Sequence, residues 1–91
     1  MAQDVPFVGG AVLHAAILGA FRASGRSFDS WCAENGLRPG AVRLATYGQS
    51  RGPKGQALLA RVIEAAGPEV VRTAYLERLK SHVSDLKDGV A

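Results

Sequence analysis

The chain has 91 residues, of which 47% are hydrophobic, and it carries one cysteine and a net charge of +3. This length accommodates one modest hydrophobic core, the hydrophobic content excludes wholesale disorder, and a lone cysteine excludes an internal disulfide bond. The apolar stretch from Val8 to Phe21 is interrupted by His14 and is too short to span a bilayer, and the first residues lack a basic signal region. We therefore expect a single soluble intracellular domain.

The positive charge is concentrated in the middle of the chain. Five of the 11 Lys and Arg residues, and no acidic residue, lie between Glu34 and Glu64. These cations are Arg38, Arg43, Arg51, Lys54 and Arg61. The pattern favours a partner rich in phosphate, although an ordinary solvated surface gives the same charge distribution.

Residues 1–10 are rich in Gly, Pro and small side chains, and we expect them to form a flexible arm. A first helix is predicted from about Ala11 to Ser24, and Gly25 ends it. Its apolar side is predicted to consist of Val12, Ala15, Ala16, Leu18 or Gly19, and Phe21. Ser27 is a good N-cap for a second helix that runs to about Asn35. The buried side of that second helix is predicted to be Phe28, Trp31 and Cys32.

Residues 28–47 have the spacing of a helix-turn-helix. Cys32 stands where two steeply crossing helices need a small residue, and Gly36 follows at the sharp turn, where positive φ is favoured. Pro39 suits the first turn of a third helix that runs to about Tyr47. Leu37, Val42 and Ala45 are predicted to face inward, and Arg43, Leu44 and Tyr47 outward.

Residues 48–55 have the composition of a polar loop, and a fourth helix is predicted from about Gln56 to Ala66. Its core side is predicted to be Leu58, Leu59, Val62 and Ile63. A last helix is predicted from Pro68 to about Lys87, with a short coiled-coil-like seam. The seam residues are Leu76, Leu79, Val83 and Leu86. Such a seam fits either dimerisation or packing of the helix on its own domain.

We therefore predict an all-α fold, a compact bundle of about five helices with a central helix-turn-helix. Residues 11–67 would form a DNA-binding domain, and residues 68–91 a C-terminal helix that serves as a possible dimerisation element.

A helix-turn-helix presents the turn and the first turns of its second helix to the major groove of double-stranded DNA. The residues in these positions are Arg38, Gly40, Arg43 and Leu44, which we predict to contact bases. Arg43 is the favoured reader because a guanidinium pairs with the O6 and N7 atoms of guanine. Gly40 would allow close approach, and Leu44 would meet a thymine methyl group.

The segment after this helix supplies donors suited to phosphate. The predicted phosphate-contacting residues are Tyr47, Gln49, Ser50, Arg51, Lys54 and Gly55. Lys54 would lie just before a helix N-terminus, where the amides of Gly55 and Gln56 would also face an anion. Two alternatives stay open: Tyr47 packs on the fourth helix, or the loop is an ordinary flexible connection.

Catalytic and metal-binding patterns are weak in this chain. His14 and His82 lie on different predicted helices, and neither has a Cys or carboxylate at metal-ligand spacing. We interpret His14 as a partly buried polar residue, His82 as a surface residue and Cys32 as core. We expect no cofactor, no metal ion and no enzymatic activity.

The segment Gly36-Leu37-Arg38-Pro39, together with Arg43, Pro53-Lys54-Gly55 and an apolar helix that ends at Gly67, resembles the Ner-like regulators of transposable phages. These belong to the wider lambda-repressor-like class. The resemblance covers roughly residues 18–67, and it implies a compact helical domain that binds operator DNA, often as two copies. The loop before Pro53 looks longer than in that family, and the helix from Pro68 onward is unlike its short tail.

The resulting hypothesis is a sequence-specific DNA-binding transcriptional regulator of phage or prophage origin. It would act as a cytoplasmic, nucleoid-associated homodimer. The alternative is a protein-interaction module in which the basic segment and the last helix bind an acidic partner, such as RNA polymerase or an assembly factor.

Overall fold

The structure is a computed structural model that describes residues 7–90, with side chains described for residues 7–81. Within these residues the chain forms five helices and no strand, which confirms the predicted all-α fold. The helices are α1 (Ala11–Ala23), α2 (Phe28–Glu34), α3 (Pro39–Thr46), α4 (Pro53–Ala66) and α5 (Pro68–Val90).

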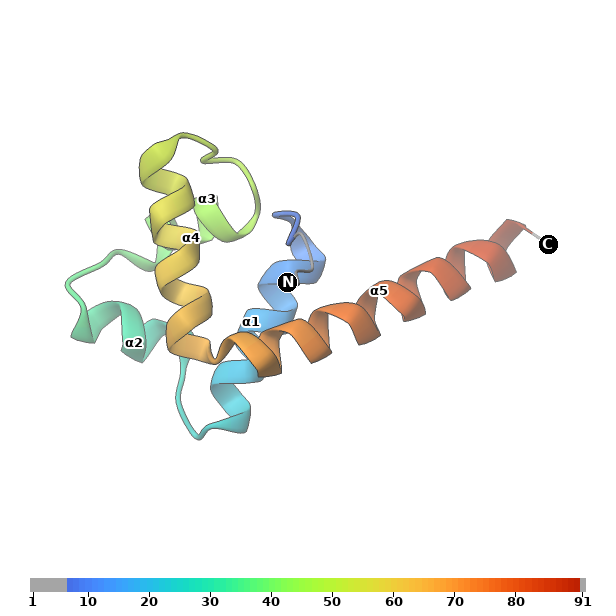
Figure 1. The fold of residues 1–91 in the computed structure, drawn as a ribbon, viewed down its shortest axis with the longest axis horizontal. Coiled ribbons are helices and arrows are strands. Elements are labelled where there is room, and N and C mark those ends of the chain that lie inside the picture. The colour runs from blue at the N-terminus through green and yellow to red at the C-terminus, as the bar shows by residue number, and fades with distance from the viewer. Residues whose placement is uncertain (1–6, 91) are drawn as a thin grey trace.

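The arrangement of the helices is seen in Figure 1. α5 lies across α1, and this is the most extensive contact between any two helices. The C-terminal half of α5 projects away from the other four helices. α3 packs mainly on α4, and α2 contacts both α1 and α3, so the three-helix group α2–α3–α4 forms the end of the molecule opposite to the tip of α5.

One hydrophobic core joins all five helices. α1 and α2 contribute most of its side chains, and α5 closes it with Val71 and Tyr75. The fully buried core side chains of largest volume are Phe21, Leu13, Ile17, Val42, Val62, Val71, Thr46 and Cys32. Because α5 covers α1 in this way, the last helix packs on its own domain over its first half.

The predicted bounds of α1 are confirmed, but its predicted apolar side is wrong in part. The buried residues of α1 are Leu13, His14, Ala16, Ile17, Ala20 and Phe21, whereas Val12, Ala15, Leu18 and Gly19 are only half-buried. The 13-residue helix holds Arg22 as its one charged residue, so it is apolar almost all round. In such a helix the packing partners decide which face is buried, because the periodicity has little contrast.

The predicted start of the fourth helix is also wrong, since α4 begins at Pro53, three residues before the predicted Gln56. Pro53 occupies the first helical position, where its missing N–H costs nothing. Gly55 then lies in the first turn, and a Cβ atom there would collide with the carbonyl oxygen of Ser50. Because α4 begins at Pro53, the loop that joins α3 and α4 is shorter than predicted. On the predicted core side of α4, Val62 is fully buried and its three apolar companions are half-buried.

The predicted seam of α5 is divided between two environments. Leu79 packs against the core, whereas Leu76 is 39% exposed. Val83 and Leu86 lie outside the described side chains, as does His82.

Candidate nucleic-acid interface

The helix-turn-helix geometry is built by local hydrogen bonds around residues 27–37. Ser27 caps α2, because its Oγ accepts a hydrogen bond from the Ser30 amide at 3.0 Å. At the other end the Leu37 amide donates to the Cys32 carbonyl oxygen at 2.8 Å, and the Gly36 amide to that of Ala33 at 3.2 Å. This is the Schellman arrangement, and Gly36 has the left-handed φ of +67° that it requires. The predicted turn at Gly36 is confirmed.

The contact between the two motif helices is closed by small and branched side chains. Cys32 on α2 and Val42 on α3 are both completely buried, and Leu37 packs against the same core. Burial raises the pKa of the Cys32 thiol above its ordinary value, and the nearby Asp29 carboxylate acts in the same direction. The thiol is therefore kept neutral inside the core, as predicted for an architectural cysteine.

Three of the four predicted base-contacting residues share the outer side of α3. Gly40, Arg43 and Leu44 are exposed and spaced three and four residues apart, so they form one helical face. Leu44 is 49% exposed. Arg38 is the N-cap residue of α3 and is exposed beside this face.

Arg43 has a contact that the linear sequence does not reveal. Its guanidinium lies 3.5 Å from Asp29 Oδ1, with side chains 48% and 69% exposed, and 5.6 Å from the ring centroid of Phe28. An exposed ion pair of this kind stabilises a fold by about 0–1 kcal/mol. Arg43 can therefore exchange Asp29 for another acceptor at little cost, but an acidic group does lie beside the predicted reading surface.

The predicted phosphate-contacting residues are not equivalent in the structure. The amides of Gln49 and Ser50 both donate to the Leu44 carbonyl oxygen, at 2.8 and 3.0 Å, so they close the end of α3 and leave only side chains for a ligand. Arg51 is exposed and its Nε donates to the Gly48 carbonyl oxygen at 2.9 Å, which places the guanidinium at the outside of the loop. Lys54 is exposed in the first turn of α4.

Two backbone donors predicted in this segment are not available. Gly55 is buried beneath Ser50, so it does not face solvent. The Gln56 amide donates to the Gly52 carbonyl oxygen at 2.9 Å as part of α4. The prediction that these two amides clamp a phosphate is wrong, because the helix begins earlier than its sequence pattern indicates.

Tyr47 follows the last residue of α3 and is 40% exposed. Its ring stacks on His14 of α1, with centroids 4.5 Å apart and planes at 27°. The alternative prediction for Tyr47, packing on the fourth helix, did not include this partner on α1. The ring keeps an exposed edge and is held by α1.

Sequence reasoning did not link His14 to Thr46, a buried residue on α3. His14 Nδ1 and Thr46 Oγ1 are 2.8 Å apart, and both residues are buried. Thr46 follows Val42 by four residues, so helical spacing alone places it on the inner side of α3. His14 is more deeply buried than predicted, and burial lowers the pKa of its imidazole, with a smaller contribution in the same direction from the Arg43 charge.

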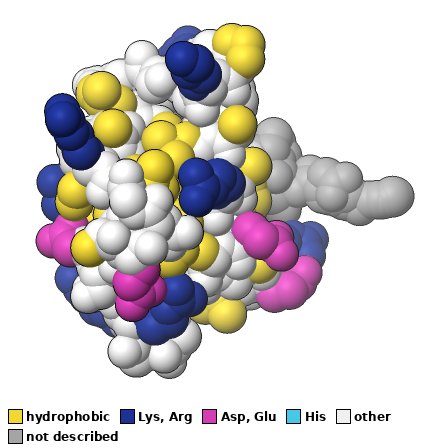
Figure 2. All heavy atoms as spheres, turned by 90° about the vertical axis from the view of Figure 1, so that its left-hand side faces the viewer, with side chains coloured by type: hydrophobic (Ala, Val, Ile, Leu, Met, Phe, Trp, Pro, Cys, Tyr) yellow, Lys and Arg dark blue, Asp and Glu magenta, His cyan; other side chains and the backbone are white. Residues whose placement is uncertain are grey.

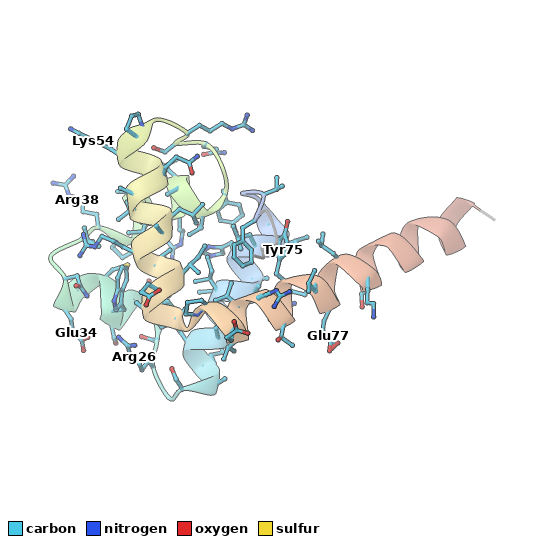
Figure 3. All side chains as sticks on the ribbon, viewed as in Figure 1. Arg26, Glu34, Arg38, Lys54, Tyr75 and Glu77 are labelled. Carbon is cyan, nitrogen blue, oxygen red and sulfur yellow. The ribbon has the colours of Figure 1, made fainter. Side chains whose placement is uncertain are left out.

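The fold gathers charged side chains on one face of the molecule. Arg38 and Lys54 project to the same side of the molecule (Figure 3), which is the side that faces the viewer in Figure 2. In Figure 2 the acidic side chains lie only in the lower half of this face, while Lys and Arg side chains are present in both halves. Arg61 is engaged elsewhere, since its guanidinium lies 6.0 Å from the Trp31 ring centroid and 3.4 Å from Asn35 Oδ1.

Comparison with protein-family models, with curated proteins and with solved structures finds no match. Within the part of the chain that the structure describes, no group of three His, Cys, Asp or Glu side chains is placed to hold a metal ion. In the same residues, none of the helices combines the length and apolar character needed to cross a membrane.

Proposed function

We propose that this protein is a sequence-specific DNA-binding transcriptional regulator of phage or prophage type, which binds operator DNA with the outer side of α3. The observation that carries the proposal is the exposed face of Gly40, Arg43 and Leu44 on the second helix of a Schellman-closed helix-turn-helix. A glycine, an arginine and an aliphatic side chain on one face suit close approach, guanine recognition and a thymine methyl contact, respectively.

Affinity would come mainly from phosphate contacts around this face. Arg38 at the start of α3 and Lys54 at the start of α4 project to one side of the molecule, as Figure 3 shows. With Arg51 they would contact the backbone on either side of the groove that α3 enters. Gln49, Ser50 and Tyr47 would contribute through their side chains.

We propose that the protein binds operator DNA as a homodimer, because two copies contact a longer DNA sequence than one copy does. The exposed Leu76 and the projecting half of α5 support a dimer contact along that helix. The same features favour a second candidate function, a protein-interaction module. In that case α5 and the basic face would bind an acidic partner such as RNA polymerase.

Arg43→Ala tests the proposal at the residue expected to read sequence. After selection of preferred sites from a randomised duplex library, the variant should lose about 1–3 kcal/mol of binding free energy at the preferred site. On unrelated DNA the loss should be smaller, because the guanine contact is absent there. Binding is measured by fluorescence anisotropy of labelled duplexes.

Arg22→Ala is the matched control, since Arg22 is an exposed arginine in the last turn of α1, away from α3 and from the proposed dimer contact on α5. It removes the same charge from another surface, so its binding to the preferred site should stay near that of the wild type. A library that yields no enriched sequence would contradict the regulator function. Equal losses for the two variants would contradict the reading role of Arg43.

A further inference from the structure

His14 is the point at which α1 contacts both helices of the helix-turn-helix. The side chain is 6% exposed. Its ring meets the edge of Phe28 on α2 at 5.5 Å and stacks on Tyr47 at the end of α3 at 4.5 Å. Its Nδ1 atom is 2.8 Å from Thr46 Oγ1. One buried polar side chain therefore links three segments that surround the proposed reading face.

Two contacts of Thr46 favour one tautomer of His14. The Thr46 hydroxyl donates to the Arg43 carbonyl oxygen at 3.1 Å, and its oxygen lies 2.8 Å from His14 Nδ1. Because the hydroxyl has a single proton, both contacts are hydrogen bonds at once only when Nδ1 carries a proton and donates it to Thr46. Burial favours the neutral ring by lowering the pKa of the imidazole, and the positive charge of Arg43 on α3 acts in the same direction. The other groups in contact are the Phe28 ring from α2 and the Tyr47 phenol ring from α3.

The same turn of α3 is held from a second direction. The Gly10 amide donates to the Thr46 carbonyl oxygen at 2.9 Å, and the Tyr47 amide donates to the Arg43 carbonyl oxygen at 2.8 Å. The backbones of Gly9 and Gly48 lie in direct contact, with no room for a Cβ atom on Gly9. The end of α3 is thus held by backbone hydrogen bonds and, in addition, by the side-chain contacts that run from His14 to Thr46 and from Thr46 to the Arg43 carbonyl oxygen.

We propose that His14 is a positioning residue for the reading surface: its neutral ring, with the proton on Nδ1, sets the orientation of the last turn of α3 and of the Tyr47 ring. The proposal rests on the proposed DNA-binding function. His14 is too buried to touch DNA, and it acts through Thr46 and Tyr47. A change in this link therefore alters DNA affinity more than a comparable loss of core packing elsewhere on α1.

The tautomer is tested first, without DNA. Nitrogen NMR of the imidazole at about pH 7, near the upper edge of the ordinary histidine titration range, should show a protonated Nδ1 and a bare Nε2. A ring protonated on Nε2 alone would overturn the proposal, because the Thr46 hydroxyl would then donate to Nδ1 and no longer to the Arg43 carbonyl oxygen.

The coupling is tested by a double-mutant cycle with DNA affinity as the readout. Thr46→Val removes the hydroxyl at nearly constant volume, and His14→Phe keeps an aromatic ring without the donor. Each should weaken binding to the preferred duplex about fivefold, the effect of one lost hydrogen bond. The double variant should bind no more weakly than either single variant, because both remove the same link. Thr46→Ser, which keeps the hydroxyl, should restore binding.

Ile17→Val controls for a general loss of stability, since Ile17 is fully buried on α1. All affinities are compared at a temperature at which each variant is folded by circular dichroism. Ile17→Val should bind DNA like the wild type. Additive losses in the cycle, or an equal loss in Ile17→Val, would overturn the positioning role. Absence of DNA binding by the wild type would instead contradict the proposed function, so the two failures are distinguishable.

Discussion

Phe21→Ala is expected to lower the free energy of unfolding by about 3–5 kcal/mol, as measured for large-to-small changes in other cores. Phe21 is completely buried on α1, and its ring lies 6.3 Å from that of Phe28 and 6.0 Å from that of Trp31. It therefore joins α1 to the first motif helix, and alanine would leave a cavity between them. Because small domains are typically stable by only about 5–15 kcal/mol, this loss would leave the fold marginal.

Urea denaturation measures the Phe21→Ala effect directly. Trp31 is the single tryptophan of the chain and packs against Phe21, so its fluorescence reports on this part of the core. Leu44→Ala is the control, since Leu44 is 49% exposed. It should change stability by no more than about 0.5 kcal/mol. Equal stability losses in the two variants would contradict the assignment of Phe21 to the centre of the core.

Replacing Arg51 and Lys54 together with alanine is expected to weaken DNA binding on the order of 50-fold for each bound protomer at about 0.1 M salt, and to reduce the slope of log K against log salt by about two for each bound protomer. Each phosphate contact releases condensed counterions, so each lost cation removes close to one unit of that slope. Both side chains are exposed, with Arg51 on the loop after α3 and Lys54 in the first turn of α4. Anisotropy titrations from about 50 to about 200 mM salt give the slope.

The control for this double variant removes the same charge away from α3 and from the proposed dimer contact. Arg22 on α1 and Arg78, which lies on α5 beside Gly19, are both exposed. Their replacement with alanine should leave the slope near the wild-type value. If this control variant lost as much slope as the loop variant, binding would depend on net charge rather than on the face around α3.

The helix-turn-helix was predictable because its signals are local. Ser27, Gly36 and Pro39 each act on the backbone within a few residues, as N-cap, left-handed turn residue and first helical residue. Cys32 and Val42 follow from helical spacing, and both are buried as predicted. The exposure of Arg43 and Leu44 follows from the same spacing.

Other features of the fold could not be predicted, chiefly because they depend on contacts between segments distant in the sequence. The buried face of α1 is set by α5, which follows it by some fifty residues of chain, so the nearly uniform apolar pattern of α1 could not reveal it. The early start of α4 is by contrast a local feature, with Pro53 at the first helical position, which the turn-like composition of residues 48–55 disguises. The pairing of His14 with Thr46 joins two helices and leaves no local sequence signal.

The cations between Glu34 and Glu64 likewise differ in their surroundings, which the sequence does not show. Sequence groups Arg61 with the other cations, but its guanidinium lies over Trp31 and reaches Asn35. Asp29 lies outside the acid-free interval in the sequence, yet it contacts Arg43 on the proposed reading side. Charge along the chain thus supports the proposal of a phosphate-rich partner, whereas the contacts that each cation makes on the protein surface are seen only in the fold.

Backbone NMR during titration with a short DNA duplex tests the central claim most directly, because it locates the DNA-binding surface on the folded protein. The largest amide shift changes are expected in residues 38–44 and 49–54, with α5 little affected. Shift changes confined to α5 and the adjoining surface of α1, or no change at low salt, would contradict a DNA-reading role for α3.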